Sequence, residues 1–294
     1  MTLVTLAATQ MAIASNEADT LDRAEALVRD AAEKGAQIIL LQELFAGPYF
    51  CQDERPEDLM RAKPLNDCKV AARFADLARE LGVVMPISFY EEANMARFNS
   101  LAMADADGQI LGIYRKSHIP HGSGYQEKFY FSPGDTGFRV WETAFGKVGA
   151  GICWDQWFPE AARAMALQGA DVLLYPTAIG SELFDPAADT SGHWRRVMQG
   201  HAGANLVPLV ASNRIGTEQG HNGTSMTFYG TSFIAGIEGE ILADLDRTTG
   251  GVAVATVDFK QLAEKRAAWG IFRDRRPDLY GPLLSLDGGP NGKA

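Results

Sequence analysis

A pattern of alternating strands and helices occurs twice along this chain, and it restricts the fold more than any other feature of the sequence. The first copy is a strand, helix, strand, helix, strand and hairpin at residues 4–10, 16–34, 36–41, 69–81, 83–88 and 99–116. The second copy has the same order at residues 148–153, 159–168, 170–175, 193–205, 207–212 and 231–245. The copies match in pattern and not in residue identity, which indicates an architectural repeat.

Two such halves predict a four-layer αββα sandwich of the α/β class, with two sheets packed face to face and helices outside. The alternative is a single doubly wound sheet, which the two hairpins and the number of strands disfavour. No linker rich in Pro, Gly or Ser separates the halves, so we expect a single domain over 1–294. From about residue 273 the chain becomes rich in Pro and Gly, which indicates a C-terminal arm or a frayed end.

The composition argues against several classes of function. A net charge of −10 disfavours a nucleic-acid partner and is mildly consistent with a cationic or neutral substrate. The three cysteines, Cys51, Cys68 and Cys153, are too scattered for a disulfide framework or a zinc site, so we expect reduced thiols. The start of the chain lacks a basic leader, and no apolar run approaches a membrane-spanning length. We therefore expect a cytoplasmic protein with no membrane partner.

Cys153 lies where an apolar strand at 148–153 leads into a helix that starts near Pro159. A thiol on a strand-to-helix turn is placed for nucleophilic attack. The N–H groups at the start of the helix point back toward the turn, and we expect them to lower the pKa of the thiol. The alternative is a small buried core residue, because free cysteines often occupy protein cores.

Two further strand ends carry charged groups, Glu43 after the strand at 36–41 and Lys116 at the end of the hairpin. Active sites of α/β sheets collect at the carboxyl ends of strands. A carboxylate beside a thiol can act as a general base, and a lysine can hold the oxyanion that forms when a thiolate attacks a carbonyl. Alternatively, Glu43 caps the segment after it and Lys116 is a solvated strand end.

The residues around these three positions resemble the Glu-Lys-Cys triad of the nitrilase superfamily of carbon–nitrogen hydrolases, and the resemblance spans nearly the whole chain. The matching segments are Leu41-Gln42-Glu43-Leu44-Phe45, Tyr114-Arg115-Lys116-Ser117-His118 and Gly151-Ile152-Cys153-Trp154-Asp155. This resemblance implies an αββα sandwich, a homo-oligomer of two or more copies, no cofactor and no metal. Glu127, within Tyr125-Gln126-Glu127-Lys128-Phe129, matches a second glutamate of the superfamily that positions the substrate or the base.

Two longer segments, 118–131 and 193–202, resemble the branch of the superfamily that hydrolyses N-carbamoylputrescine in putrescine and polyamine biosynthesis. The implied mechanism has Glu43 take the thiol proton while Cys153 attacks the ureido carbonyl. Lys116 and the backbone N–H of Trp154 hold the oxyanion, and ammonia leaves. Water activated by Glu43 then cleaves the carbamoyl thioester, and the released carbamate decomposes to putrescine and carbon dioxide. We expect Lys116→Ala to nearly abolish turnover and to leave the fold largely intact.

A cationic ureido substrate needs a partner for its distal ammonium and apolar walls for its methylene chain. Glu182, in the loop after the strand at 172–177, is the candidate partner, and a solvated loop acid is the alternative. The candidates for the walls are the aromatic side chains of Trp154, Trp157 and Tyr130. His121 is a further candidate for contact with the substrate.

Three other functions are weighed against this hypothesis. His118 and His121 suggest a metal site or a Cys-His pair, but they have no helical context or third ligand, and Lys116 and Glu43 would have no role. Another amidase of the superfamily, of the β-ureidopropionase or ω-amidase type, would bind a carboxylate and need a cation where Glu182 stands. A binding protein that has kept the fold without catalysis is the third alternative, and the intact triad disfavours it.

Overall fold

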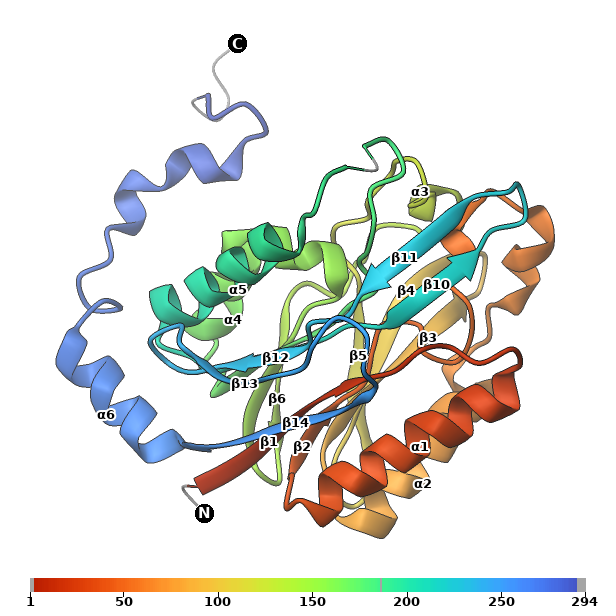
Figure 1. Ribbon diagram of the computed structural model, residues 1–294. Helices are drawn as coiled ribbons and strands as arrows, with labels where there is room; N and C mark the ends of the chain where they lie inside the picture. The colour runs from red at the N-terminus through yellow and green to blue at the C-terminus, as the bar shows by residue number, and fades with distance from the viewer. Residues whose placement is uncertain (1–2, 186, 290–294) are drawn as a thin grey trace.

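Two β-sheets pack face to face in this protein, with helices covering the outer side of each sheet (Figure 1). The structure is a computed structural model that describes residues 3–185 and 187–289. The first sheet joins two three-stranded parts, β14-β1-β2 and β3-β4-β5, through a bridge between Ile38 and Val84. Its strands are β1 (Leu3–Gln10), β2 (Ile38–Leu40), β3 (Met85–Ala93), β4 (Ala96–Ala104), β5 (Ile110–Arg115) and β14 (Gly251–Asp258).

The second sheet has the strand order β13-β12-β9-β8-β7-β6. Its strands are β6 (Arg139–Thr143), β7 (Gly146–Ala150), β8 (Val172–Pro176), β9 (Leu209–Ser212), β12 (Phe233–Ala235) and β13 (Ile241–Asp244). Its central strands β7, β8 and β9 run parallel, so their carboxyl ends meet at one edge. A separate hairpin, β10 (Ile215–Gln219) with β11 (Ser225–Tyr229), stands between β9 and β12 in the sequence.

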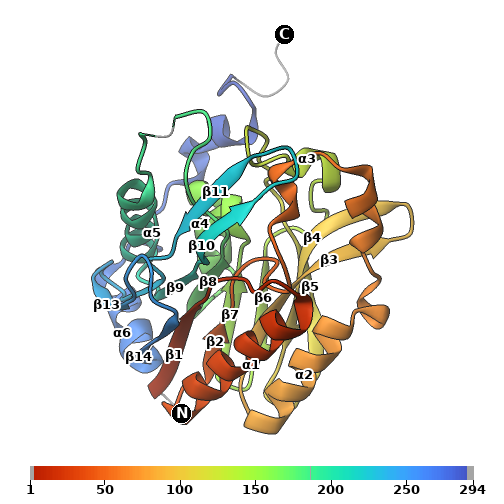
Figure 2. The ribbon, with the colours of Figure 1, turned by 45° about the vertical axis from the view of Figure 1, so that its right-hand side comes forward.

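Three apolar layers hold these elements together. Side chains from both sheets, including Leu6, Ile38, Val148 and Val172, form the inner core between them. Helices α1 (Glu17–Glu33) and α2 (Lys69–Leu81) pack on the first sheet. Helices α4 (Pro159–Leu167) and α5 (Ser191–Asn205) pack on the second, as the turned view also shows (Figure 2). The predicted αββα sandwich is therefore confirmed, and the single doubly wound sheet was the wrong alternative.

Capping residues mark the start of α1 and the end of α2, while the helix expected at 193–205 begins two residues earlier, at Ser191. Asn16 precedes α1, and its side chain accepts a hydrogen bond from the N–H of Asp19. Gly82 ends α2 with a φ of +65°, a left-handed conformation that glycine adopts without strain. Short helical segments fill the connections: η1 (Phe50–Gln52), η2 (Pro56–Arg61), η3 (Leu65–Asp67), α3 (Glu127–Tyr130), η4 (Cys153–Trp157), η5 (Pro277–Leu279) and η6 (Gly281–Leu284).

The structure adds elements that the repeat pattern did not predict. The strand expected at 83–88 extends to Ala93 and forms a hairpin with β4, so the first half has two antiparallel pairings in succession. Strand β14 lies antiparallel to β1 and completes the first sheet, as Figure 1 shows. The strand expected at 148–153 ends at Ala150, so Cys153 stands at the start of η4 rather than in the strand.

After β14 the chain forms α6 (Phe259–Trp269) and continues without joining either sheet (Figure 1). The segment 270–289, which we call the arm, exposes the apolar side chains Leu279, Leu283, Leu284 and Leu286. The arm expected from about residue 273 continues to Ala294, and 290–294 lie outside the described residues. A search of the described helices finds none with the length and apolar character needed to cross a membrane.

Candidate active site

The charged residues at the three strand ends lie together inside the protein. Glu43 follows β2, Lys116 follows β5 and Cys153 opens η4 after β7. The side chains of Glu43 and Lys116 are fully buried, and Cys153 is 4% exposed. Lys116 is therefore not a solvated strand end. Glu43 does not cap the segment after it, because its Oε1 accepts from Asn99 and Lys116 and its Oε2 has no donor among the described residues. Buried charges are retained in proteins when they are paired, so their partners decide what this cluster can do.

Lys116 bridges two carboxylates. Its Nζ donates to Glu43 Oε1 at 2.9 Å and to Glu127 Oε2 at 2.6 Å, and all three side chains are fully buried. Burial lowers the pKa of Lys116, but the charges of Glu127 and Glu43 outweigh it and raise this pKa well above its ordinary value. Lys116 therefore keeps its proton and can donate to an oxygen that becomes negative.

Glu127 is the carboxylate that titrates near neutral pH. Burial raises its pKa from the ordinary 4.5 to about 7, against the lowering effect of the Lys116 charge and with the further raising effect of the Glu43 charge. Its Oε1 accepts a hydrogen bond from the Tyr49 hydroxyl at 2.6 Å. Glu127 thus holds Lys116 from the side opposite to Glu43.

Glu43 keeps one oxygen free for chemistry. Its Oε1 accepts hydrogen bonds from Asn99 Nδ2 at 2.7 Å and from Lys116. Its Oε2 is buried and has no hydrogen-bond partner among the described residues. A buried carboxylate oxygen without a donor can accept a proton from a neighbouring group, as a general base does.

The thiol of Cys153 does not have the lowered pKa expected from the helix that follows it. Burial raises the pKa of Cys153 well above its ordinary value, and the negative charge of Glu43 raises it further. Helix α4 begins only at Pro159, too far along the chain to offset desolvation at the sulfur. The resting residue is therefore a neutral thiol, whose Sγ lies 3.9 Å from the carbonyl oxygen of Ala178. Its conversion to a nucleophile requires a base.

A buried carboxylate that sequence reasoning missed, Asp155, fixes the turn at Cys153. Its Oδ2 accepts from the N–H of Ile152 at 2.9 Å and from the Tyr114 hydroxyl at 2.7 Å. Its Oδ1 accepts from the N–H of His118 at 3.0 Å and lies 2.7 Å from His118 Nδ1. Asp155 follows Cys153 by two residues in the segment that resembles the superfamily. An acidic side chain so close to the thiol could have indicated that it fixes this turn.

The same contacts account for His118, which was considered as a metal ligand. Its ring stacks on Phe158 with the centroids 3.6 Å apart and is held by Asp155. No group of three or more His, Cys, Asp or Glu side chains suited to hold a metal ion occurs in residues 3–185 and 187–289. His118 therefore has a packing and orienting role in the part of the chain that the structure describes.

A cavity of about 330 Å³ opens beside Cys153. Four of the sequence-predicted substrate contacts, Trp154, Trp157, His121 and Glu182, line it together with Cys153. Its remaining lining residues are Pro120, Gly122, Ser123, Tyr125, Ile179, Phe184, Thr190 and His193. The cavity therefore contains the thiol and has aromatic walls. Among the described lining residues, Glu182 supplies its single carboxylate.

Tyr130 lies elsewhere. It is buried, its ring packs edge-on against Phe50 at 5.0 Å, and its hydroxyl donates to the carbonyl of Asp53. Tyr130 thus fastens the segment around η1 and does not line the cavity beside Cys153. Its aromatic character had suggested a wall, but an aromatic side chain fills a core as readily as it lines a pocket.

Glu182 is half-buried at the cavity wall. Desolvation raises the pKa of its carboxyl, and its Oε1 lies 3.5 Å from the Thr190 hydroxyl. The loop that carries it is held in place, because the N–H of Gly180 donates to the Tyr125 hydroxyl at 3.0 Å. A desolvated carboxylate in a largely apolar cavity can bind an ammonium group.

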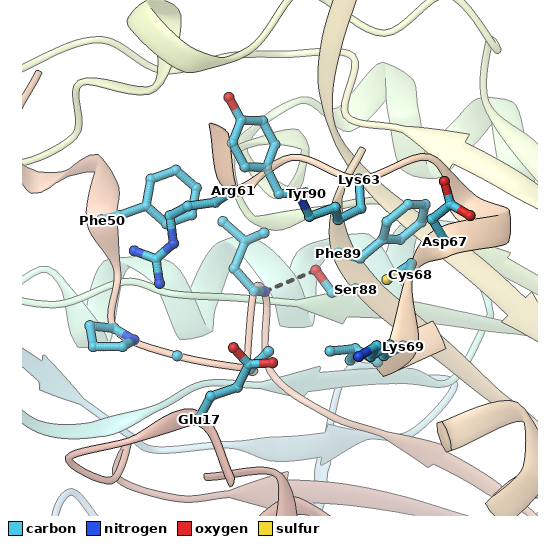
Figure 3. A pocket seen from close by; sticks show the side chains of 15 residues that line it. Glu17, Phe50, Arg61, Lys63, Asp67, Cys68, Lys69, Ser88, Phe89 and Tyr90 are labelled. Atoms are coloured by element: carbon cyan, nitrogen blue, oxygen red, sulfur yellow. Dashed lines mark hydrogen bonds between the residues drawn. The ribbon is translucent and has the colours of Figure 1, made fainter. Parts of the chain in front are cut away.

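A second cavity, of about 430 Å³, is lined in part by the segment that follows Glu43, which contributes Leu44, Gly47 and Phe50 (Figure 3). Figure 3 shows Phe50, Arg61, Lys63 and Tyr90 along its wall. Cys153 does not line it. This cavity is therefore separate from the one that contains the thiol.

Comparisons with known proteins find relatives over nearly the whole chain. The model of the family "Carbon-nitrogen hydrolase" matches residues 5–267. The N-carbamoylputrescine amidase of Arabidopsis thaliana is 60% identical over 288 residues, which are 97% of this chain and 96% of the relative. The citrullinase of Francisella tularensis is 49% identical over 284 residues, 97% of this chain and 99% of the relative. The crystal structure of a carbon–nitrogen hydrolase from Helicobacter pylori G27 superposes with a TM-score of 0.91 at 38% identity, covering 97% of this chain and 99% of the other.

Proposed function

Since the chain belongs to the carbon–nitrogen hydrolase family, as the sequence resemblance predicted, we propose that it hydrolyses N-carbamoylputrescine to putrescine, carbon dioxide and ammonia. One observation carries the choice of substrate: the cavity beside Cys153 places Glu182 among aromatic walls, with no Lys or Arg among its described lining residues. Such a cavity suits a ureido group at one end of a methylene chain and an ammonium at the other. The 60% identity to a relative of that activity supports the same choice.

In the first half of the reaction, the free Oε2 of Glu43 takes the proton from the Cys153 thiol as the sulfur attacks the ureido carbon. The oxygen of that carbon becomes negative, and Lys116 Nζ and the N–H of Trp154 in the first turn of η4 donate to it. The bond from the carbon to the terminal nitrogen then breaks. Glu43 returns its proton to that nitrogen, and ammonia leaves a carbamoyl thioester on the sulfur.

In the second half, Glu43 takes a proton from a water molecule that attacks the thioester carbonyl. The carbon–sulfur bond breaks, and the proton on Glu43 returns to the Cys153 sulfur. The released carbamate of putrescine loses carbon dioxide to give the free amine. Because burial keeps the resting thiol neutral, each half depends on Glu43 as the proton carrier.

The charge of the far end of the substrate separates this proposal from its closest rivals. N-Carbamoyl-β-alanine, a β-ureidopropionase substrate, carries only a carboxylate at its far end. Citrulline, suggested by the citrullinase relative, carries a carboxylate beside an ammonium. A carboxylate placed near Glu182 would be repelled, and the described lining residues offer no Lys or Arg to bind it. The substrates of ω-amidases also carry a carboxylate, so the same repulsion applies to them.

Ammonia release from N-carbamoylputrescine, N-carbamoyl-β-alanine, citrulline and glutamine tests the proposal. We expect N-carbamoylputrescine to have the highest kcat/KM. Glu182→Gln should raise KM for it and leave the slow hydrolysis of the anionic N-carbamoyl-β-alanine unchanged or faster. Glu264→Gln, on the exposed surface of α6, is the matched control. A preference for an anionic substrate, or an unchanged KM in Glu182→Gln, would overturn the assignment.

A protein that kept the fold without catalysis would give a different result. Alkylation of Cys153 by iodoacetamide should stop ammonia release, and Cys153→Ala should be inactive while remaining folded. Activity that survives both treatments would remove Cys153 from the mechanism. Retained alkylation with no hydrolysis of any ureido or amide compound would favour the binding protein.

We also propose that the chain is one domain with a C-terminal arm and that it forms a homo-oligomer. The two halves share one inner core, which supports a single domain. The exposed leucines of the arm and the exposed Trp269 offer apolar surface for a second copy. Light scattering of the full chain and of a chain ending at 272 tests the assembly, with a smaller particle expected for the shorter chain.

A cytoplasmic location and a role in putrescine biosynthesis complete the proposal. The cysteines Cys51, Cys68 and Cys153 are all buried and free, which suits a reducing compartment. Cell fractionation tests the location. Loss of putrescine on deletion of the gene, with accumulation of its carbamoyl precursor, tests the role.

A further inference from the structure

Arg214, which lies between β9 and β10, fastens the backbone that carries Glu43. Its side chain is fully buried. Its Nη2 donates to the carbonyl oxygens of Glu43 at 2.7 Å and of Leu44 at 3.1 Å, and its Nη1 donates to that of Gly47 at 3.3 Å. A buried guanidinium with three backbone acceptors in one loop is a strong constraint on that loop.

Glu218, on β10, connects Arg214 to the opposite side of the site. Its Oε1 accepts from Arg214 Nη1 at 2.8 Å, and its Oε2 accepts from the backbone N–H of Tyr49 at 2.6 Å. The Tyr49 hydroxyl in turn donates to Glu127, and Glu127 holds Lys116. These contacts close a ring that runs from Glu43 through Lys116, Glu127, Tyr49, Glu218 and Arg214 back to Glu43.

The backbone inside this ring is strained. Leu44 has a φ of +47°, in the left-handed region that side chains other than glycine rarely adopt. Such a conformation persists only where its surroundings fix it on several sides. Here the N–H of Leu44 donates to the Ser88 hydroxyl at 2.9 Å, and its carbonyl accepts from Arg214. This backbone sets the direction of the Glu43 side chain together with the hydrogen bonds that its Oε1 accepts from Asn99 and Lys116. Its Oε2 has no donor among the described residues.

The charges in the ring balance when Glu127 is protonated. Arg214 and Lys116 are cations, and Glu43 and Glu218 are then the two anions. Burial raises the pKa of Glu127 to about 7, so this balanced form exists at and below neutral pH. A ring without excess charge has little tendency to rearrange in a low-dielectric interior.

We propose that Arg214 and Glu218 are positioning residues that hold the Glu43 carboxylate in place to take the proton of the Cys153 thiol. The inference rests on the proposed function in one respect, the role of Glu43 as the base. Neither residue lines the cavity beside Cys153, so they act through the backbone of Glu43 and through Tyr49 rather than on the substrate.

The test compares Arg214→Lys and Glu218→Gln with a matched control, Arg266→Lys. Arg266 is a partly buried arginine that also donates to two backbone carbonyls, of Leu206 and Ala170, but it belongs to α6 and has no contact with the ring among these hydrogen bonds. We expect kcat to fall about 100-fold in Arg214→Lys and roughly tenfold in Glu218→Gln, with KM changed by less than about twofold. Arg266→Lys should keep the wild-type kcat.

The pH profile of Cys153 alkylation by iodoacetamide supplies the readout that a purely structural role would not change. Wild-type protein should react at neutral pH because Glu43 removes the thiol proton. Arg214→Lys and Glu218→Gln should not react at neutral pH. They should react only at alkaline pH, where the thiol ionises without a base. Peptide mapping separates Cys153 from the buried Cys51 and Cys68.

The outcomes are separable. Folded ring variants with wild-type kcat and an unchanged alkylation profile would overturn the inference, even if they unfold more easily. If Arg214→Lys does not fold, Glu218→Gln carries the test alone, because it keeps the size of the side chain while it removes the negative charge and one of the two acceptors that face Arg214 and Tyr49. Alkylation needs no substrate, so a wild-type protein inactive on every ureido compound would refute the proposed function and leave this comparison valid.

Discussion

Lys116 is the residue whose removal tests the electrostatics of the site most directly. Lys116→Ala leaves Glu43 and Glu127 fully buried beside each other with no cation between them. Removing one partner of a buried ion pair costs about 3–5 kcal/mol, which is a large part of the roughly 5–15 kcal/mol that holds a domain folded. The expectation that this substitution leaves the fold largely intact is therefore replaced. We expect a marginally stable protein whose kcat is also lower by about 100- to 1,000-fold.

The pH dependence of this destabilisation has a definite sign. Lys116 lowers the pKa of Glu127, so its removal raises that pKa above 7. A carboxyl with a raised folded pKa favours the folded state at low pH and loses this advantage as pH rises through the folded pKa. In wild-type protein the loss of folding stability with rising pH ends near pH 7, the pKa of Glu127. In Lys116→Ala this loss of stability continues to higher pH. The stability deficit of the variant should therefore grow by about 1.4 kcal/mol per pH unit above pH 7.

Guanidinium chloride unfolding at pH 6, 7, 8 and 9, followed by fluorescence, measures this deficit. In Lys116→Ala/Glu127→Gln the growth above pH 7 should be smaller, because the amide does not titrate. Lys34→Ala is the matched control, since Lys34 and Asp30 form an ion pair of 2.7 Å at the surface. It should change stability by less than about 1 kcal/mol. A Lys116→Ala protein with the stability and pH dependence of Lys34→Ala would refute the reasoning.

Three further predictions follow from the contacts of the site. Glu127→Gln should remove a loss of about 3 kcal/mol in unfolding free energy that wild-type protein undergoes between pH 4.5 and 7, measured by chemical unfolding, and an unchanged slope would contradict it. Tyr49→Phe removes a hydrogen bond that lowers the pKa of Glu127, so the pH at which Glu127 titrates should rise, as measured by the same unfolding series. Asp155→Asn should lower stability by about 1.5–3 kcal/mol and slow Cys153 alkylation, whereas Asp135→Asn at the surface should do neither.

The layers of this fold could be predicted from the sequence because each element has one clear periodicity. Helix α1 buries Leu21, Ala24 and Val28 at helical spacing, and the strands β2 and β8 are continuous apolar runs. Strand β10 could not be found in this way. Four of its five residues are not buried, so its side chains follow no apolar alternation. Residues 215–219 form a strand because they pair with β11, and this pairing cannot be seen in the pattern of residues 215–219 alone.

The site residues also divide into those that local sequence indicates and those that depend on contacts far away in the chain. Glu43, Lys116 and Cys153 could be predicted because each follows a strand and belongs to a segment with a specific resemblance. The pKa of Cys153 was predicted in the wrong direction, because local sequence contains the helix after the thiol but not the desolvation around it. Arg214 also follows a strand, β9, yet a single arginine normally suggests a solvated surface. Its burial depends on carbonyl groups far away in the chain.

The pairing of β14 with β1 also constrains how the protein is made. The two strands pair over eight residues although about 240 residues of chain separate them. Until β14 is synthesised, β1 is an edge strand of largely buried apolar character, a template for pairing with other chains. A truncated chain ending before residue 251 would contain every proposed site residue and still have this open edge. Its expected fate is aggregation, so the pairing of these strands protects the completed chain from aggregation as well as completing the sheet.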